Sequence, residues 1–132
     1  MSRVFVTGSV SGLGRAAAAE LLSGGHEVVI HGRDRGRLAE AADLVERGAV
    51  AVVGDLSDPT GPKAVAEQVN ELGHMDSVIH NAGVYSGPSV LAVNVLAPYL
   101  LTALIEKALA PRLSQQWNAP QRSSGPCRAR PG

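Results

Sequence analysis

Short apolar runs alternate along the chain with longer segments in which apolar side chains recur every three or four positions. Each run is nearly continuous in Val, Ile, Leu and Ala, which is typical of strands buried on both faces of a parallel sheet. The segments between the runs have the period of amphipathic helices. The expected strands cover residues 3–6, 26–31, 49–53 and 75–80.

Four helices are predicted between and after these strands. Gly24-Gly25 ends the first helix, Asp34 caps the second, and Gly48 ends the second. A bend is expected in the fourth helix near Pro98, because proline cannot donate the helical hydrogen bond. The first, third and fourth patterns cover residues 12–22, 58–72 and 90–110. The buried faces expected for the first three helices consist of Leu13, Ala17 and Leu21; of Leu38, Ala41, Ala42 and Val45; and of Val65, Val69 and Leu72.

This alternation predicts an α/β fold with a doubly wound parallel sheet of the Rossmann type. Right-handed crossover connections then give the strand order 3-2-1-4, which is half of a dinucleotide fold plus one strand. The sequence therefore predicts a partial Rossmann-type domain of about four strands over residues 1–111.

The periodic pattern stops after Pro111. Residues 112–132 are rich in proline, serine and glutamine and follow neither period, so we expect them to be disordered. Residues 1–111 contain twelve acidic and eight basic residues, whereas residues 112–132 contain four arginines and no acid. This abrupt change indicates an aberrant tail, from a frameshift, a mispredicted gene or a truncated isoform.

Three glycines stand where the first strand passes into the first helix: Gly8, Gly12 and Gly14. The N–H groups at the start of a helix have no intrahelical partners and lie at the positive end of the helix dipole. A pyrophosphate binds such N–H groups when no Cβ blocks its approach. Gly8 would permit the tight turn, Gly12 the approach of phosphate, and Gly14 close packing of the helix on the sheet. The alternative is a glycine-rich turn without a ligand.

The segment "TGSVSGLG" resembles the TGxxxGxG signature of the short-chain dehydrogenase/reductase family. Three further stretches match the family in the same order: "GDLSD" from Gly54, "HNAG" from His80 and "VNVLAPYLLT" from Val93. The resemblance covers residues 1 to about 110 and implies an NAD(P)-dependent oxidoreductase that reduces carbonyls or oxidises alcohols. The cofactor-binding positions expected from the loop and the resemblance are Gly8, Ser9, Ser11, Gly12, Leu13, Gly14, Arg33, Asp55, Leu56, Asn81, Ala82 and Gly83.

The cofactor expected is NADP, with NAD as the alternative. An acidic residue at the tip of the second strand favours NAD, and an arginine nearby accommodates the 2′-phosphate of NADP. Gly32 occupies the tip and Arg33 follows it, an arrangement that resembles NADP-preferring members of the family. Asp34 is then simply a helix cap, and Arg33 is either a phosphate ligand or a solvated surface charge.

The resemblance implies that Asn94 is a catalytic residue, although the same side chain could instead bond to helix or loop backbone. The family's proton donor is a tyrosine followed four positions later by a lysine, and neither Tyr85 nor Tyr99 has that partner. We therefore expect the chain as given to bind the cofactor weakly, if at all, and not to turn over. Two alternatives are a non-catalytic dinucleotide-sensing or protein-interaction module and an enzyme that uses Tyr85 beside Asn94 as an unfamiliar proton donor.

Charge and composition bear on the partners expected. The net charge of zero argues against a broad nucleic-acid or anionic-membrane surface, and no apolar stretch is long enough to span a bilayer. The single cysteine, Cys127, fits a reducing compartment, and we expect a cytoplasmic protein. The wide apolar surface of the last helix predicts either a homo-oligomer through this helix, as the resemblance implies, or contact with a missing part of the core. No metal site is predicted, and His26, His31 and His74 are expected at the surface or at strand ends.

Overall fold

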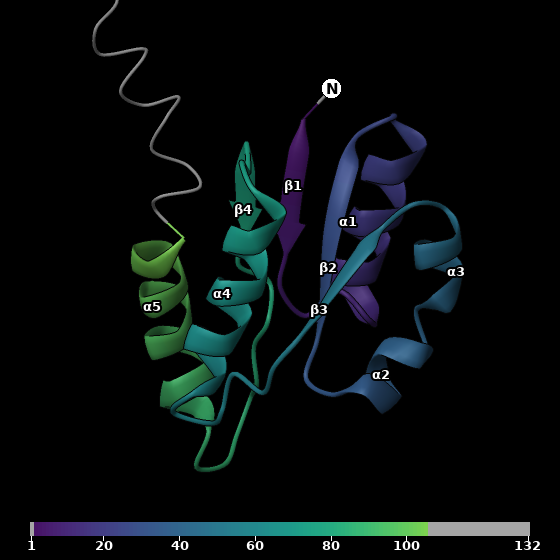
Figure 1. Cartoon of the computed structure of the whole chain (residues 1–132). Helices are drawn as coiled ribbons and strands as arrows, with labels where there is room; N and C mark the ends of the chain where they lie inside the picture. The colour runs from purple at the N-terminus through teal and green to yellow at the C-terminus, as the bar shows by residue number, and fades with distance from the viewer. Residues whose placement is uncertain (1, 106–132) are drawn as a thin grey trace, which may run out of the picture.

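Strands and helices alternate in the computed structural model, which describes residues 2–105 (Figure 1). The predicted tail at residues 112–132 and the end of the last predicted helix lie outside these residues. None of the helices formed by residues 2–105 combines the length and hydropathy needed to cross a membrane. The elements are β1 (Arg3–Val6), α1 (Gly12–Ser23), β2 (Glu27–Gly32), α2 (Arg35–Ala39), α3 (Ala42–Glu46), β3 (Val50–Val53), α4 (Gly61–Leu72), β4 (Ser77–Ile79), the π-helix η1 (Ala92–Leu96) and α5 (Ala97–Leu104).

The four strands form one parallel sheet in the order β3-β2-β1-β4, as predicted. The helices α1, α2 and α3 cover one face of the sheet, and α4 and α5 cover the other (Figure 1). This is the doubly wound arrangement, which leaves the carboxyl ends of all four strands at one edge. Within residues 2–105, β4 pairs with a neighbour on one side only, as the order of the strands requires.

Alternate residues of each strand supply two separate hydrophobic cores. Val4 and Ile30 point towards α1, whereas Phe5 and Val29 point towards α4 and α5. Phe5 is completely buried and is the single phenylalanine of the chain, so aliphatic side chains provide most of both cores. Burial on both faces explains why the strands are continuous apolar runs in the sequence.

The predicted buried face of the first helix is correct only in part, because Leu21 packs against the core but Leu13 does not. Leu13 is 84% exposed, whereas Gly14 and Ala18 are buried against the sheet. Within the glycine loop (residues 7–14), the start of α1 lies so close to Gly8 that a Cβ at position 14 would collide with the carbonyl of Gly8. Close approach therefore selects the smallest residues for the buried face, and the larger Leu13 turns outward.

The second predicted helix is divided into α2 and α3. Ala41, at φ −108° and ψ 22°, lies outside the helical region and is completely buried between the two pieces. The break turns α3 so that Leu44 enters the core and Val45 is exposed, which corrects the predicted face. The capping prediction is confirmed, because the Asp34 carboxylate accepts the N–H of Arg37 at 2.8 Å.

The third helix starts later than predicted, and the fourth starts at Val90 as predicted but is not a regular α-helix throughout. The third begins at Gly61, because the Asp58 carboxylate accepts the N–H and hydroxyl of Thr60 and holds a turn there. The fourth is irregular ahead of Pro98, where η1 makes a wider turn closed by the N–H of Ala97 on the carbonyl of Ala92. Pro98 has no N–H for the carbonyl of Asn94, so the normal helical ladder is interrupted one turn earlier than the proline itself.

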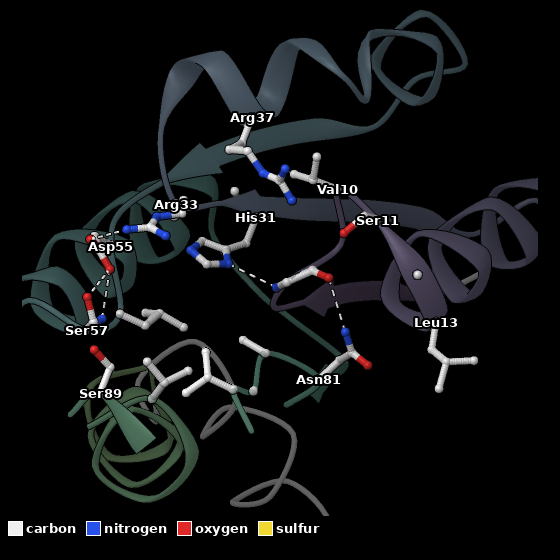
Figure 2. Close-up of a pocket in the computed structure, with 18 of the residues that line it drawn as sticks. Val10, Ser11, Leu13, His31, Arg33, Arg37, Asp55, Ser57, Asn81 and Ser89 are labelled. Carbon is white, nitrogen blue, oxygen red and sulfur yellow. Dashed lines mark hydrogen bonds and ion pairs between the residues drawn. The ribbon is translucent and has the colours of Figure 1, made fainter. Parts of the chain in front are cut away.

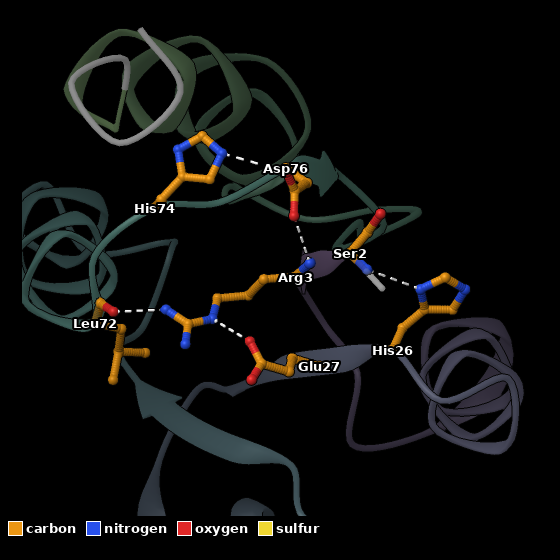
Figure 3. Close-up of polar contacts among 7 residues, drawn as sticks. All are labelled: Ser2, Arg3, His26, Glu27, Leu72, His74 and Asp76. Carbon is orange, nitrogen blue, oxygen red and sulfur yellow. Dashed lines mark hydrogen bonds and ion pairs between the residues drawn. The ribbon is translucent and has the colours of Figure 1, made fainter. Parts of the chain in front are cut away.

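A cluster of polar contacts ties the strands together at the edge opposite to their carboxyl ends (Figure 3). The Arg3 guanidinium donates to Glu27 at 2.9 Å and to the carbonyl of Leu72 at 2.7 Å. The N–H of Arg3 donates to Asp76, which also lies 3.2 Å from the ring of His74. These contacts fix the amino ends of β1 and β2 against the segment between α4 and β4.

Candidate functional site

A hollow of about 600 Å³ opens at the carboxyl ends of the four strands. Its walls come from the loops after β1, β2, β3 and β4, which is the position where doubly wound sheets bind ligands. Ten of the predicted cofactor-binding residues line it: Gly8, Ser11, Gly12, Leu13, Arg33, Asp55, Leu56, Asn81, Ala82 and Gly83. The side chains that sequence reasoning did not assign to this site include His31, Arg37, Ser57 and Ser89, which come from β2, α2 and two loops.

The glycine loop presents an open backbone to this hollow. Gly8 and Gly12 have φ values of +62° and +61°, a left-handed conformation that L side chains rarely adopt. A Cβ added to Gly12 would have no protein atom within 4 Å, so the space beside it is free. Ser11 precedes α1 in an extended conformation and makes no side-chain cap hydrogen bond. The first N–H groups of α1 are therefore left for an anion.

The loop after β4 is fixed next to the glycine loop by Thr7. This side chain is buried, and its hydroxyl oxygen accepts the N–H groups of Asn81 at 3.0 Å and Ala82 at 3.1 Å. The Asn81 amide in turn donates to the carbonyl of Gly8 at 3.1 Å. Gly14 lies against both the Asn81 amide and the Gly8 carbonyl and does not line the hollow itself.

Ser9 differs from the prediction that it faces the cofactor. Its hydroxyl is completely buried, donates to the carbonyl of Val6 at 2.9 Å and accepts the N–H of His31 at 2.7 Å. The Ser9 side chain therefore joins the glycine loop to β2 and does not line the hollow. Its contribution to a ligand site is to hold the loop in place.

His31 is a strand-end residue, as expected, but it is not on the surface: only 3% of it is exposed. Its Nδ1 accepts the N–H of Gly8 at 3.0 Å, and its Nε2 lies 2.7 Å from the carbonyl of Gly54. Nε2 therefore carries the ring proton, because a carbonyl can only accept. Figure 2 shows the ring between the Arg33–Asp55 pair and the glycine loop. Burial lowers the pKa of His31, partly offset by the Gly54 carbonyl and the charge of Asp55.

The far end of the hollow carries opposite charges. Arg33 lies 3.3 Å from Asp55, and both side chains are partly exposed. The Ser57 hydroxyl and N–H, followed by Arg33, lower the pKa of Asp55, so that carboxylate is ionised. Arg37 from α2 also lines the hollow, with its guanidinium beside Val10 (Figure 2). Gly32 occupies the tip of β2, where a Cβ would collide with Leu38 and Val10, so an acidic side chain has no room there.

Asn94 holds the loop after β4 from the side of η1. Its amide oxygen accepts the N–H of Val84, and its amide nitrogen donates to the carbonyl of Val84, both at 2.8 Å. The structure therefore places Asn94 on loop backbone, outside the walls of the hollow. Tyr85, the next residue along that loop, is fully exposed at the mouth. His80, which directly follows β4, bonds to the hydroxyl of Thr102 at 2.9 Å.

Known proteins share both the sequence and the fold. The sequence pattern of the family described as short chain dehydrogenase matches residues 2–112. An uncharacterised oxidoreductase of Emericella nidulans is 44% identical over 122 residues, which cover 83% of this chain and 48% of that protein. A short-chain dehydrogenase from Sphingobium yanoikuyae in complex with NADPH is 30% identical with a TM-score of 0.70, covering 88% of this chain and 50% of that one.

A metagenomic short-chain oxidoreductase in complex with NADP is 32% identical, with a TM-score of 0.71 over 84% of this chain and 57% of the other. The chain spans about half the length of the curated relatives it matches most strongly. The predicted resemblance and the Rossmann-type fold are both confirmed by these matches. The chain belongs to the short-chain dehydrogenase family.

Proposed function

We propose that the hollow binds NADP(H) and that the chain supplies the dinucleotide-binding half of an oxidoreductase acting on carbonyls or alcohols. The observation that carries this proposal is the open backbone at Gly12, where the left-handed φ and the free space leave the start of α1 accessible to a diphosphate. Relatives of the same fold are complexes with NADP or NADPH, which supports the same ligand for this chain.

The preference for NADP over NAD rests on the groups around the end of β2. Gly32 leaves no space for the acidic side chain that would bind the ribose 2′-hydroxyl of NAD. Arg33 directly follows Gly32 and lines the hollow, and Arg37 from α2 supplies a second guanidinium to its lining. A 2′-phosphate there would compete with Asp55 for Arg33 and would be bound by a charge-assisted hydrogen bond.

The chemistry proposed for the family member is hydride transfer, which the nicotinamide supplies when it is bound. The residues of this chain would hold the cofactor and keep the loops in place, and Asn94 fixes the loop after β4 at Val84. Tyr-x-x-x-Lys does not occur in the 132 residues. We therefore propose that these residues alone bind the cofactor without turnover.

Two further assignments belong to this proposal. Large apolar side chains are exposed along residues 91–104, which supports a second copy packing on the last helix. Light scattering on the purified chain tests this: a dimer that L91S/Y99S converts to a monomer is the expected result, and a wild-type monomer contradicts it. The single cysteine supports a reducing compartment such as the cytoplasm.

Calorimetric titration of the purified chain with NADP⁺ and NAD⁺ tests the central proposal. Wild-type protein should bind NADP⁺ more tightly than NAD⁺. The G12A variant should lose about tenfold or more in affinity for both, because a left-handed alanine is strained and its methyl enters the free space. G25A is the matched control, since Gly25 has φ +81° and open surroundings at the other end of α1. Equal losses in G12A and G25A would contradict a diphosphate site at the loop.

A further inference from the structure

His31 links three parts of the fold that meet at the hollow. The ring belongs to β2, receives the N–H of Gly8 from the glycine loop, and reaches the carbonyl of Gly54 at the end of β3. The backbone of His31 adds two contacts to the same loop, because its carbonyl accepts the N–H of Ser9 and its N–H donates to the Ser9 hydroxyl. One residue of β2 thus fixes the loop at consecutive positions.

These contacts require one protonation state of the ring. Gly8 offers an N–H and Gly54 offers a carbonyl, so Nδ1 must be an acceptor and Nε2 a donor. The imidazolium ion has N–H groups on both nitrogens, and its Nδ1–H would face the N–H of Gly8. Protonation of the ring therefore removes the acceptor of a part-buried backbone N–H and opposes it with a second donor.

Gly8 transmits such a change to the remainder of the site. It has a left-handed φ of +62°, its Cα lies against Ala82, and its carbonyl accepts the Asn81 amide while packing on Gly14 at the start of α1. A movement of Gly8 away from the ring would therefore disturb the turn, the loop after β4 and the first N–H groups of α1 together.

The charged groups around the ring favour the neutral form on balance. Burial lowers the pKa of His31, while the Gly54 carbonyl and the charge of Asp55 act in the opposite direction. Arg33 and Arg37 are the other charged side chains that line the hollow. Arg33 pairs with the same Asp55 carboxylate at 3.3 Å.

We propose that His31 is a positioning residue: its neutral ring keeps the glycine loop in the shape that binds a dinucleotide, and protonation of Nδ1 weakens that binding. The inference rests on the proposed function, because it concerns the affinity of the same hollow. It adds a pH-dependent element to the glycine loop, whose contacts with Val6, Asn81 and Ala82 involve backbone, hydroxyl and amide groups.

The test is the affinity for NAD⁺, measured by calorimetry on the full chain between pH 8 and pH 5, with NADP⁺ in parallel. NAD⁺ is the main probe because a 2′-phosphate has its own ionisation near pH 6. Wild-type affinity should fall by about fivefold or more as the pH is lowered, the loss expected from one hydrogen bond. H31N keeps an acceptor for Gly8 that does not ionise, so its affinity at pH 8 should be close to wild type and unchanged at pH 5.

H31L lacks the acceptor and should bind NAD⁺ at least about fivefold more weakly than H31N at every pH. A comparison of the two variants at pH 8 is therefore enough to test the acceptor. H26N is the matched control, because His26 also accepts a backbone N–H through Nδ1, from Ser2, at the opposite edge of the sheet (Figure 3). It should retain the wild-type pH profile. Wild-type affinity that is constant or rises towards pH 5, or equal affinity of H31L and H31N at pH 8, overturns the role of His31. Absence of binding by wild type at pH 8 instead overturns the proposed function.

Discussion

The Arg33 guanidinium lies 3.3 Å from the Asp55 carboxylate and joins the ends of β2 and β3 at the rim of the hollow. Both side chains are partly exposed, so the pair contributes little to stability. Its importance is for recognition: the guanidinium is held at the place where the end of β2 meets a ligand, and it is available to a phosphate that displaces the carboxylate.

R33A should weaken NADP⁺ binding by about ten- to a hundredfold, because it removes a charge-assisted hydrogen bond to the 2′-phosphate. NAD⁺ binding should change by much less. Calorimetric titration of both dinucleotides measures the difference. R35A is the control, since Arg35 lies on the same segment without lining the hollow. Equal losses for the two dinucleotides in R33A would defeat the assignment to NADP.

T7V should destabilise the protein by about 2 kcal/mol, because the buried hydroxyl accepts two backbone N–H groups and valine accepts none. The free energy of unfolding from urea titration measures this loss. T60V should cost less, since Thr60 is an exposed residue at the start of α4. A T7V protein as stable as wild type would mean that these N–H groups find other partners.

Stability should decrease as the pH falls below about 6.5, the ordinary pKa of histidine. The pKa values of His31 and His80 are both lowered by burial, so the unfolded chain binds more protons than the native one in that window. The contribution of these histidines to the free energy of unfolding is therefore complete above pH 6.5 and decreases as the pH is lowered. Urea titrations at pH 8, 6.5 and 5.5 measure the slope, and H31N should reduce it. An unchanged slope in H31N would assign the effect to other groups.

N94A should expose the backbone of Val84 to solvent exchange. Asn94 both accepts the N–H and donates to the carbonyl of Val84, so alanine removes both contacts at once. Hydrogen exchange read out by mass spectrometry should show faster exchange in the loop after β4. N70A removes a contact between α4 and the carbonyl of Leu104 and should leave that loop unchanged. Identical exchange in N94A and wild type would contradict the role of Asn94 in holding the loop after β4.

R3M should lower the free energy of unfolding by about 1 kcal/mol without changing dinucleotide affinity. Arg3 is the first residue of β1, at the other end of this strand from the glycine loop, and it donates to Glu27 and to the Leu72 carbonyl. Urea titration and calorimetry measure the two quantities separately. A loss of NADP⁺ affinity in R3M would mean that the two edges are coupled.

The architecture and most of the hollow could be predicted from the sequence, because they depend on patterns that a chain displays directly. Buried parallel strands are continuous apolar runs, and the TGSVSGLG segment identifies where β1 passes into α1. The order of the four strands in the sheet follows from the handedness of their connections. Arg33 could be placed at the hollow because it follows the tip of β2, whereas Asp55 could be placed there only from the family resemblance of the GDLSD segment.

Side-chain partners could not be predicted in the same way. Leu13 has the period of a buried residue, but the close approach of Gly14 to the glycine loop rotates the helix and exposes it. His31 and Ser9 carry polar side chains that a sequence pattern places at the surface or against a ligand. Their burial depends on reciprocal hydrogen bonds between β2 and the loop, which only a three-dimensional arrangement reveals.

Gly8 is restrained through both of its backbone polar groups: its N–H donates to the His31 ring and its carbonyl accepts the Asn81 amide. A dinucleotide arriving at this loop would therefore meet a receptor that has already lost its conformational freedom, and little ordering remains to be done on contact. Variants that loosen the Gly8 peptide should slow association as well as shorten the lifetime of the complex.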